Sequence, residues 1–151
     1  MRWDEFERAA PDFAEAGLRL FATAQDEGVL IAYMATVSAN GTPRIAPVCP
    51  IHAGGELFIS AGTTTPKVRD LQERGRYALH AFLGAGDEEF QIWGQATRIG
   101  DDGARARVHA AIRFQFDAED PVFALDVKRC RWGYWVNPGR PGTYPVHKRW
   151  P

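Results

Sequence analysis

One stretch of the chain constrains the fold more than any other, because it has the pattern of three strands joined by tight turns. Residues 29–37 form a continuous apolar and β-branched run, and the Asn-Gly pair at 40–41 is a strong hairpin signal. The chain then returns through residues 43–51, passes a Gly-Gly turn and enters a third strand at residues 57–60. Such short connections predict an antiparallel meander, since a parallel pair would need a long crossover.

Helices flank this meander and further strands follow it. Apolar residues at helical spacing predict two amphipathic helices before Gly28. Pro66 is suited to open a short helix after a loop, and Gly75 is suited to end it. The later elements expected from the same patterns are strands at 77–83 and 90–99, a helix at 102–112, and a last strand or pair of strands at 122–136.

These elements predict a mainly β protein of the α+β class, a six-stranded antiparallel β-barrel with peripheral helices. The 151 residues suit one domain that needs no disulfide, and 45% hydrophobic with 25% charged residues is ordinary globular composition. We expect a single domain over residues 1–151. Its parts are N-terminal helices in 1–28, the barrel in 29–136, and an extended tail rich in proline and glycine in 137–151.

Charge and cysteine content exclude several kinds of partner. Lysine and arginine number 18 against 19 acidic residues, so the chain has no overall basic field that would attract nucleic acid. It has no signal-peptide core and no apolar run long enough for a membrane, so we expect a cytoplasmic protein without a membrane partner. Cys49 and Cys130 stand far apart without metal-ligand spacing, and we expect free buried thiols and no metal.

Residues 63–67 have the chemistry of a phosphate site. The helix that begins at residue 66 presents unpaired backbone N–H groups at its N-terminus, three threonine hydroxyls add donors, and Lys67 adds a positive charge. The threonines are Thr63, Thr64 and Thr65. The residues alone leave a second interpretation open, in which Thr65 merely caps the helix and Lys67 is solvated.

Four segments, in their order and spacing, carry a family resemblance. They are the hairpin 35–48, the strand 57–60, the helix start 66–71 and the strand segment 91–96, which reads Gln-Ile-Trp-Gly-Gln-Ala. With these segments the chain resembles the pyridoxamine 5′-phosphate oxidase-like family of FMN-binding split barrels. The resemblance implies a split β-barrel that forms a homodimer, with FMN bound between the two subunits.

The resemblance also implies where the cofactor binds. In such relatives the isoalloxazine ring lies along the second and third strands, and a flat ring needs an apolar slot with main-chain groups aimed at its heteroatoms. The cofactor-binding residues carried over to this chain are Arg44, Ile45, Ala46, Pro47, Val48, Ser60, Ala61, Thr63, Thr64, Thr65, Lys67 and Trp93.

Two of these assignments have alternatives. Arg44 is expected either to stabilise negative charge on the reduced flavin or to face outward beside the turn. Trp93 is expected to line the ring slot from the partner subunit, or else to belong to the core or the dimer interface. The same choice holds for Trp132, Tyr134 and Trp135.

The chain departs from the oxidases themselves at two positions. Cys49 stands where they carry a substrate-binding lysine, and Pro145 stands in the arginine place of their Arg-Leu-His type motif. Both changes remove ligands for a substrate phosphate, so we expect no oxidation of vitamin B6 phosphates. No histidine pairs with a carboxylate at motif spacing, and we therefore predict no catalytic side chain.

The expected function is that of an FMN-binding protein, most simply a flavin-dependent oxidoreductase that acts on a small organic molecule. A deazaflavin-dependent reductase is the nearest alternative, because similar barrels bind deazaflavin. The alternative from a different class is a non-catalytic protein that binds flavin or haem.

Overall fold

A computed structural model describes residues 1–22 and 28–151 of the chain. In these residues it contains four helices and eight strands. The helices are α1 (Trp3–Ala9), α2 (Pro11–Ala22), α3 (Pro66–Arg74) and α4 (Asp102–Ala111). The strands are β1 (Ala32–Val37), β2 (Pro43–Val48), β3 (Ile51–Ala53), β4 (Glu56–Ser60), β5 (Arg76–Ala81), β6 (Glu89–Arg98), β7 (Val122–Val136) and β8 (Tyr144–Trp150).

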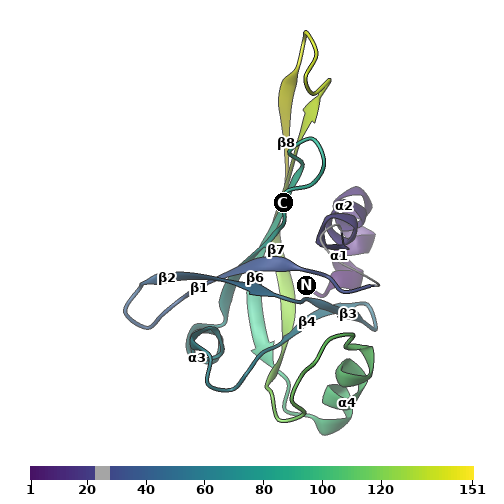
Figure 1. The fold of residues 1–151 in the computed structure, drawn as a ribbon. Coiled ribbons are helices and arrows are strands. Elements are labelled where there is room, and N and C mark those ends of the chain that lie inside the picture. The colour runs from purple at the N-terminus through teal and green to yellow at the C-terminus, as the bar shows by residue number, and fades with distance from the viewer. Residues whose placement is uncertain (23–27) are drawn as a thin grey trace.

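The strands form one antiparallel sheet in the order β2-β1-β5-β6-β7-β4-β3, and β8 adds to β7. Figure 1 shows that β7 and β8 continue beyond the rest of the sheet as a two-stranded arm, with α1 and α2 beside the sheet. This curled sheet with peripheral helices is a split β-barrel, as predicted.

The strand number is corrected from six to eight. The strand expected at 43–51 is divided into β2 and β3, because Pro50 lies between them and lacks the N–H that a continuous ladder needs. The tail is extended as expected, but residues 144–150 form β8 and pair with β7. Pro145 is tolerated there because β8 is an edge strand.

The helices at the N-terminus cover the inner face of the sheet. Phe21 of α2 packs edge-on against Phe90 of β6, with 5.6 Å between the ring centroids, and Phe6 of α1 contacts Trp150 at 4.8 Å. Trp3 and both of these helix phenylalanines are fully buried. Burying large aromatic side chains supplies much of the driving force for a domain of this size.

Helix α3 begins and ends as its sequence predicts. Pro66 opens it, and Gly75 ends it with a φ of 64°, a left-handed conformation that glycine adopts without strain. The Gly75 N–H donates to the carbonyl of Leu71 at 2.8 Å. Leu71 and Val68 are buried beneath α3, so the helix is fixed against the sheet.

None of the helices in the described residues is long and apolar enough to cross a membrane.

Candidate functional site

The segment predicted to bind a phosphate lies between β4 and α3. Thr65 occupies the N-cap position of α3, yet its hydroxyl makes no capping hydrogen bond. The side-chain oxygens Thr65 Oγ1 and Ser60 Oγ are both buried and have no hydrogen-bond partner within residues 1–22 and 28–151. An unpartnered buried hydroxyl costs free energy, so each of these oxygens calls for a partner that the described chain does not supply.

Lys67 occupies the second position of α3, directly after Pro66, and is partly buried. The backbone N–H groups of a first helical turn have no partner inside the helix, and the helix dipole is positive at this end. In this helix, however, the Val68 and Arg69 N–H groups donate to the Thr65 carbonyl at 3.1 and 3.4 Å, and Pro66 has no N–H. What the segment combines is therefore a lysine charge, the positive end of the helix dipole and two threonine or serine hydroxyls. This combination suits the terminal phosphate of a nucleotide-like cofactor.

Arg44 does not face outward, which was one of the two alternatives for it. Its guanidinium Nη1 lies 2.6 Å from Oδ1 of Asp70, and Asp70 is only 2% exposed. The other carboxylate oxygen of Asp70 accepts a hydrogen bond from the Thr36 hydroxyl at 2.7 Å. Asp70 thus connects β1, β2 and α3 through one buried carboxylate, and it fixes the position of Arg44 relative to the start of α3.

Strand β2 divides the predicted ring-binding residues between two faces. Arg44, Ala46 and Val48 lie on the less exposed face, whereas Ile45 and Pro47 lie on the outer face. Ile45 is 74% exposed. The predicted contacts of the ring with β2 therefore cannot all come from side chains of one face, and only the strand backbone is common to them.

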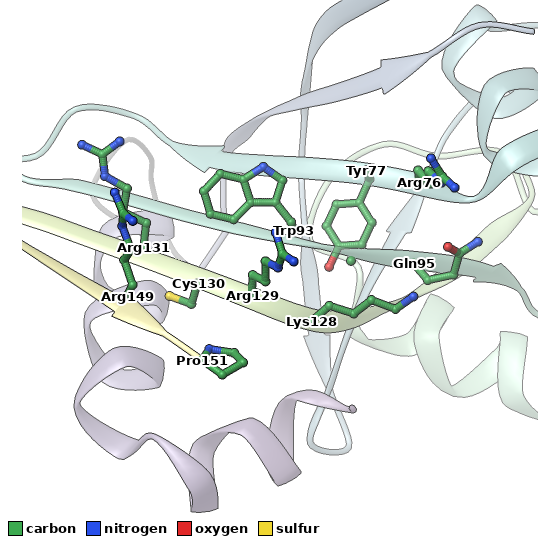
Figure 2. A pocket seen from close by; sticks show the side chains of 11 residues that line it. Arg76, Tyr77, Trp93, Gln95, Lys128, Arg129, Cys130, Arg131, Arg149 and Pro151 are labelled. Atoms are coloured by element: carbon green, nitrogen blue, oxygen red, sulfur yellow. The ribbon is translucent and has the colours of Figure 1, made fainter. Parts of the chain in front are cut away.

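A groove on the outer face of the sheet contains Trp93, the last of the predicted cofactor residues. We call it the basic groove, and its volume is about 1070 Å³. Its lining residues are Arg76, Tyr77, Trp93, Gly94, Gln95, Lys128, Arg129, Cys130, Arg131, Arg149 and Pro151. Figure 2 shows Trp93 and Arg129 near the middle of the groove, with Arg131 and Arg149 toward one end and Arg76 toward the other. Trp93 stands three strands away from β2 in the sheet order, so it is separate from the β2 residues within one chain.

A β-bulge gives the groove two of its basic residues. In the ladder between β6 and β7, Trp93 pairs with Arg129 and Gly94 pairs with Val127, so Lys128 is an extra residue. The buried–exposed alternation of β7 is broken at this point, and Lys128 and Arg129 are both exposed. Bulges redirect side chains in this way.

Burial raises the pKa of three groups near these residues, two thiols and one phenol. Burial raises the pKa of Tyr77, whose hydroxyl donates to the Asp126 carbonyl at 3.3 Å. Burial also raises the pKa of Cys130 to about 12 and raises the pKa of Cys49. Cys49 therefore offers no charge to a substrate, in line with the expectation that it cannot replace a lysine.

The aromatic residues near the C-terminus belong mainly to the base of the arm. The Trp132 indole N–H donates to Oε1 of Glu88 at 2.8 Å, and the Lys148 ammonium lies 4.7 Å from the centroid of the Trp132 ring. Tyr134 packs against Trp132. Trp135, which is 41% exposed, remains available for contact with another molecule.

Comparison with known proteins identifies the family. The family model of pyridoxamine 5′-phosphate oxidase matches residues 22–133, which is most of the chain. The protein is thus a split β-barrel by its fold, and it belongs to the pyridoxamine 5′-phosphate oxidase family. No curated protein matches the sequence.

Solved structures share this fold at low sequence identity. A pyridoxamine 5′-phosphate oxidase-related, FMN-binding protein from Nostoc punctiforme has a TM-score of 0.60 and 14% identity, over 92% of this chain and 95% of that one. A NimC/NimA family protein from Clostridium acetobutylicum has a TM-score of 0.61 and 11% identity, over 95% and 98%. A haem-binding protein from Mycobacterium smegmatis has a TM-score of 0.59 and 20% identity over 87% of this chain, which spans 56% of that protein's length.

Two parts of this site were not predicted from the sequence. Asp70 was expected only as a helix residue, because nothing local indicates that it meets a strand residue 26 positions earlier in the chain. The basic residues of the groove come from three different strands, β5, β7 and β8, and their meeting depends on the register of the sheet. The adjacent Lys128 and Arg129 in an otherwise alternating strand were the one available signal.

Proposed function

We propose that this protein binds FMN as a homodimer and uses it to oxidise or reduce a small organic molecule. Membership of the pyridoxamine 5′-phosphate oxidase family supports this proposal, as does the fold shared with an FMN-binding protein from Nostoc punctiforme. FMN, when bound, supplies the hydride chemistry, so the protein needs to bind, orient and shield rather than to provide a catalytic side chain. A cytoplasmic location and a single domain remain predictions.

The observation that carries the proposal is the pair of unpartnered hydroxyls on Ser60 and Thr65. They lie at the end of β4 and at the start of α3, where Lys67 and the positive end of the helix dipole also lie. In our proposal these groups hold the FMN phosphate, assisted by Thr63 and Thr64. Phosphate oxygens would supply the hydrogen-bond partners that the described residues do not provide.

Arg44 also contributes to the proposed site. Because Asp70 neutralises its charge, Arg44 contributes directed N–H donors more than net charge. Lys67, which forms no ion pair with the part of the chain that the structure describes, provides the positive charge. The ring would lie along the backbone of β2, where Ala46 and Val48 offer small apolar surface, and beside the buried Ala61.

An exposed apolar patch supports the homodimer. Tyr33 and Val37 of β1 and Ile45 of β2 are 46%, 37% and 74% exposed, and register places them on the same outer face. We call these three residues the apolar patch. Phe82 stacks on Tyr33 at 4.5 Å and extends it. Contiguous apolar surface of this kind is commonly covered in an assembly, and a second copy of the chain is the partner that the family resemblance implies.

Titration with two flavins tests the cofactor and its orientation together. We expect FMN to bind with a change in its visible spectrum, and Lys67→Ala to weaken FMN binding about ten- to hundredfold because one charge-assisted contact is lost. Riboflavin lacks the phosphate, so its affinity should be the same for the wild type and the variant. Arg107→Ala, which removes an exposed charge from α4, is the matched control and should change neither affinity.

Two results would contradict the proposal. Equal losses of FMN and riboflavin affinity in Lys67→Ala would remove the phosphate site from residues 63–67. A Soret band on addition of haem, with no flavin binding, would favour the haem-binding alternative, for which the similarity to the Mycobacterium smegmatis protein is the supporting observation. A redox-active complex with a deazaflavin but not with FMN would favour the remaining alternative.

A further inference from the structure

The basic groove concentrates positive charge that residues 1–22 and 28–151 neutralise only at Arg131. Five of its lining residues are arginine or lysine. Arg131 lies 3.9 Å from Glu89 and also contacts His147 at 3.2 Å. The other four, which are Arg76, Lys128, Arg129 and Arg149, make no ion pair with any residue that the structure describes. Like charges held together repel one another, so an anion in the groove would stabilise this arrangement.

The sheet register orders these charges along the groove. Arg131 faces Gln91 across the β6–β7 ladder and faces Arg149 across the β7–β8 ladder, which defines one end. Arg76 faces Gln95 and defines the other end. Gln91 and Gln95 are four residues apart on β6, so the two ends are about 13 Å apart at roughly 3.3 Å per residue.

Trp93 lies between the two charged ends, opposite Arg129 in the β6–β7 ladder. Trp93 is midway between Gln91 and Gln95 on the same face of β6, whereas Tyr77 pairs with Gly94, is only 4% exposed and belongs to the core. A flat organic group fits the Trp93 ring, whereas an anionic group fits each end.

Charge balance limits the size of the ligand. The whole chain has a net charge of -1, so the positive field is local to the groove and does not extend over a surface. The residues outside the groove carry a net negative charge, which disfavours a long polyanion such as nucleic acid. A volume of about 1070 Å³ suits a small organic molecule.

We propose that the basic groove binds a rod-shaped organic dianion, with an anionic group at each end and a flat apolar middle over Trp93. This inference rests on the proposed function in one respect, because it makes such a dianion the substrate class of the flavin site. The groove and the apolar patch lie on the same outer face of the sheet, so in the proposed dimer the groove borders the interface at which the ring is expected.

A pair of probes that differ by one charge tests the two-ended recognition. Biphenyl-4,4′-dicarboxylate has a carboxylate at each end, and biphenyl-4-carboxylate has one. We expect calorimetric titration of the full chain to show at least about tenfold tighter binding of the dicarboxylate, since the second carboxylate gains one more charge-assisted contact. The preference should decrease as salt is added.

Variants at each end locate the contacts. Arg149→Gln and Arg76→Gln should each lower the affinity for the dicarboxylate about tenfold, to the level of the monocarboxylate, while the affinity for the monocarboxylate falls about twofold. Arg107→Gln on α4 removes the same charge outside the groove and should leave both affinities unchanged. Circular dichroism and thermal midpoints of all three variants check that the fold is retained.

The possible outcomes distinguish a failure of the groove inference from a failure of the proposed flavin function. The inference would be overturned, even if FMN binds, if the wild type bound the two probes with equal affinity. It would also be overturned if Arg107→Gln lost as much affinity for the dicarboxylate as the groove variants do. Dicarboxylate binding in a protein that does not bind FMN would leave the groove as a binding site and refute the proposed flavin function. Repeating the titration with Lys67→Ala excludes binding of the probe at residues 63–67, and there the affinity should equal that of the wild type.

Discussion

Asp70 is 2% exposed, and both of its carboxylate oxygens have partners, Arg44 at 2.6 Å and the Thr36 hydroxyl at 2.7 Å. A buried ion pair contributes little net stability, because the desolvation of the charges offsets their attraction. Its clearer effect is on geometry, since the pair leaves Arg44 few alternative positions. Arg44 is 39% exposed, so part of its guanidinium remains available to a ligand.

Asp70→Asn separates the effect of position from the effect of charge. The substitution makes the site more positive by one unit, so charge alone predicts tighter binding of FMN. Loss of the ion pair frees the Arg44 side chain, and positioning predicts binding that is about tenfold weaker. We expect the weaker binding, measured by fluorescence titration of FMN. Tighter binding would show that Arg44 acts by charge and that Asp70 does not position it.

Thr36→Val is the matched control for this experiment. It removes the neutral partner of Asp70 and keeps the ion pair with Arg44. FMN affinity should remain that of the wild type, although the free energy of unfolding should fall by about 1 kcal/mol for the lost buried hydrogen bond.

The β-bulge in β7 requires a glycine on the opposite strand. A Cβ atom on Gly94 would lie 1.6 Å from the Asp126 carbonyl oxygen and 3.1 Å from Cε1 of Tyr77. The Asp126 carbonyl oxygen, at 1.6 Å, is a backbone atom, so a side-chain rotation cannot relieve the overlap. The close approach of β6 and β7 at the bulge therefore depends on Gly94.

Gly94→Ala should destabilise the protein because the two strands must separate. We expect the free energy of unfolding to fall by about 2 kcal/mol or more, which corresponds to a thermal midpoint lower by roughly 5 °C or more for a chain of this length. Gly100→Ala is the control, because no atom lies within 4 Å of its added Cβ. Differential scanning calorimetry of both variants makes the comparison, and equal midpoints would contradict the required close approach.

Elements with local signals were the ones predicted correctly from sequence. Helix α3 has Pro66 at its first position and Gly75 after its last, and both signals act within a few residues. Strand β8 was expected as an extended tail, because its pairing depends on β7 and the preceding prolines and glycines indicate only a turn. Residues 63–67 were recognisable as a candidate site because their signals are also local. The pairing of Arg44 with Asp70 was not recognisable, because it joins residues 26 positions apart.

Association of two chains is the expected state of the whole molecule. The apolar patch, with Ile45 at 74% exposure, would gain apolar burial in a dimer, at about 1.5–3 kcal/mol for a fully buried isoleucine. Light scattering should report twice the chain mass of 16.8 kDa. Ile45→Asp should shift the protein toward the monomer, because a charge would then be buried in the interface.

Phe116→Asp provides the control for this prediction. Phe116 is 36% exposed and contacts His109 of α4, on a different part of the surface. It should leave the measured mass at the dimer value. A wild-type monomer at micromolar concentration with bound flavin would remove the apolar patch as an interface and a flavin site shared between subunits.

The uneven distribution of charge also affects how quickly an anion reaches the protein. The chain as a whole is close to neutral, but five basic side chains gather in one groove, so the acidic excess lies elsewhere on the surface. The groove is therefore a local positive pole on a chain whose remaining residues carry a net negative charge. Within a Debye length of about 8 Å at physiological salt, this pole attracts and orients an approaching dianion before contact. Ionic strength then acts on the association rate constant, and the dissociation rate is set by the contacts formed with Trp93 and the arginines.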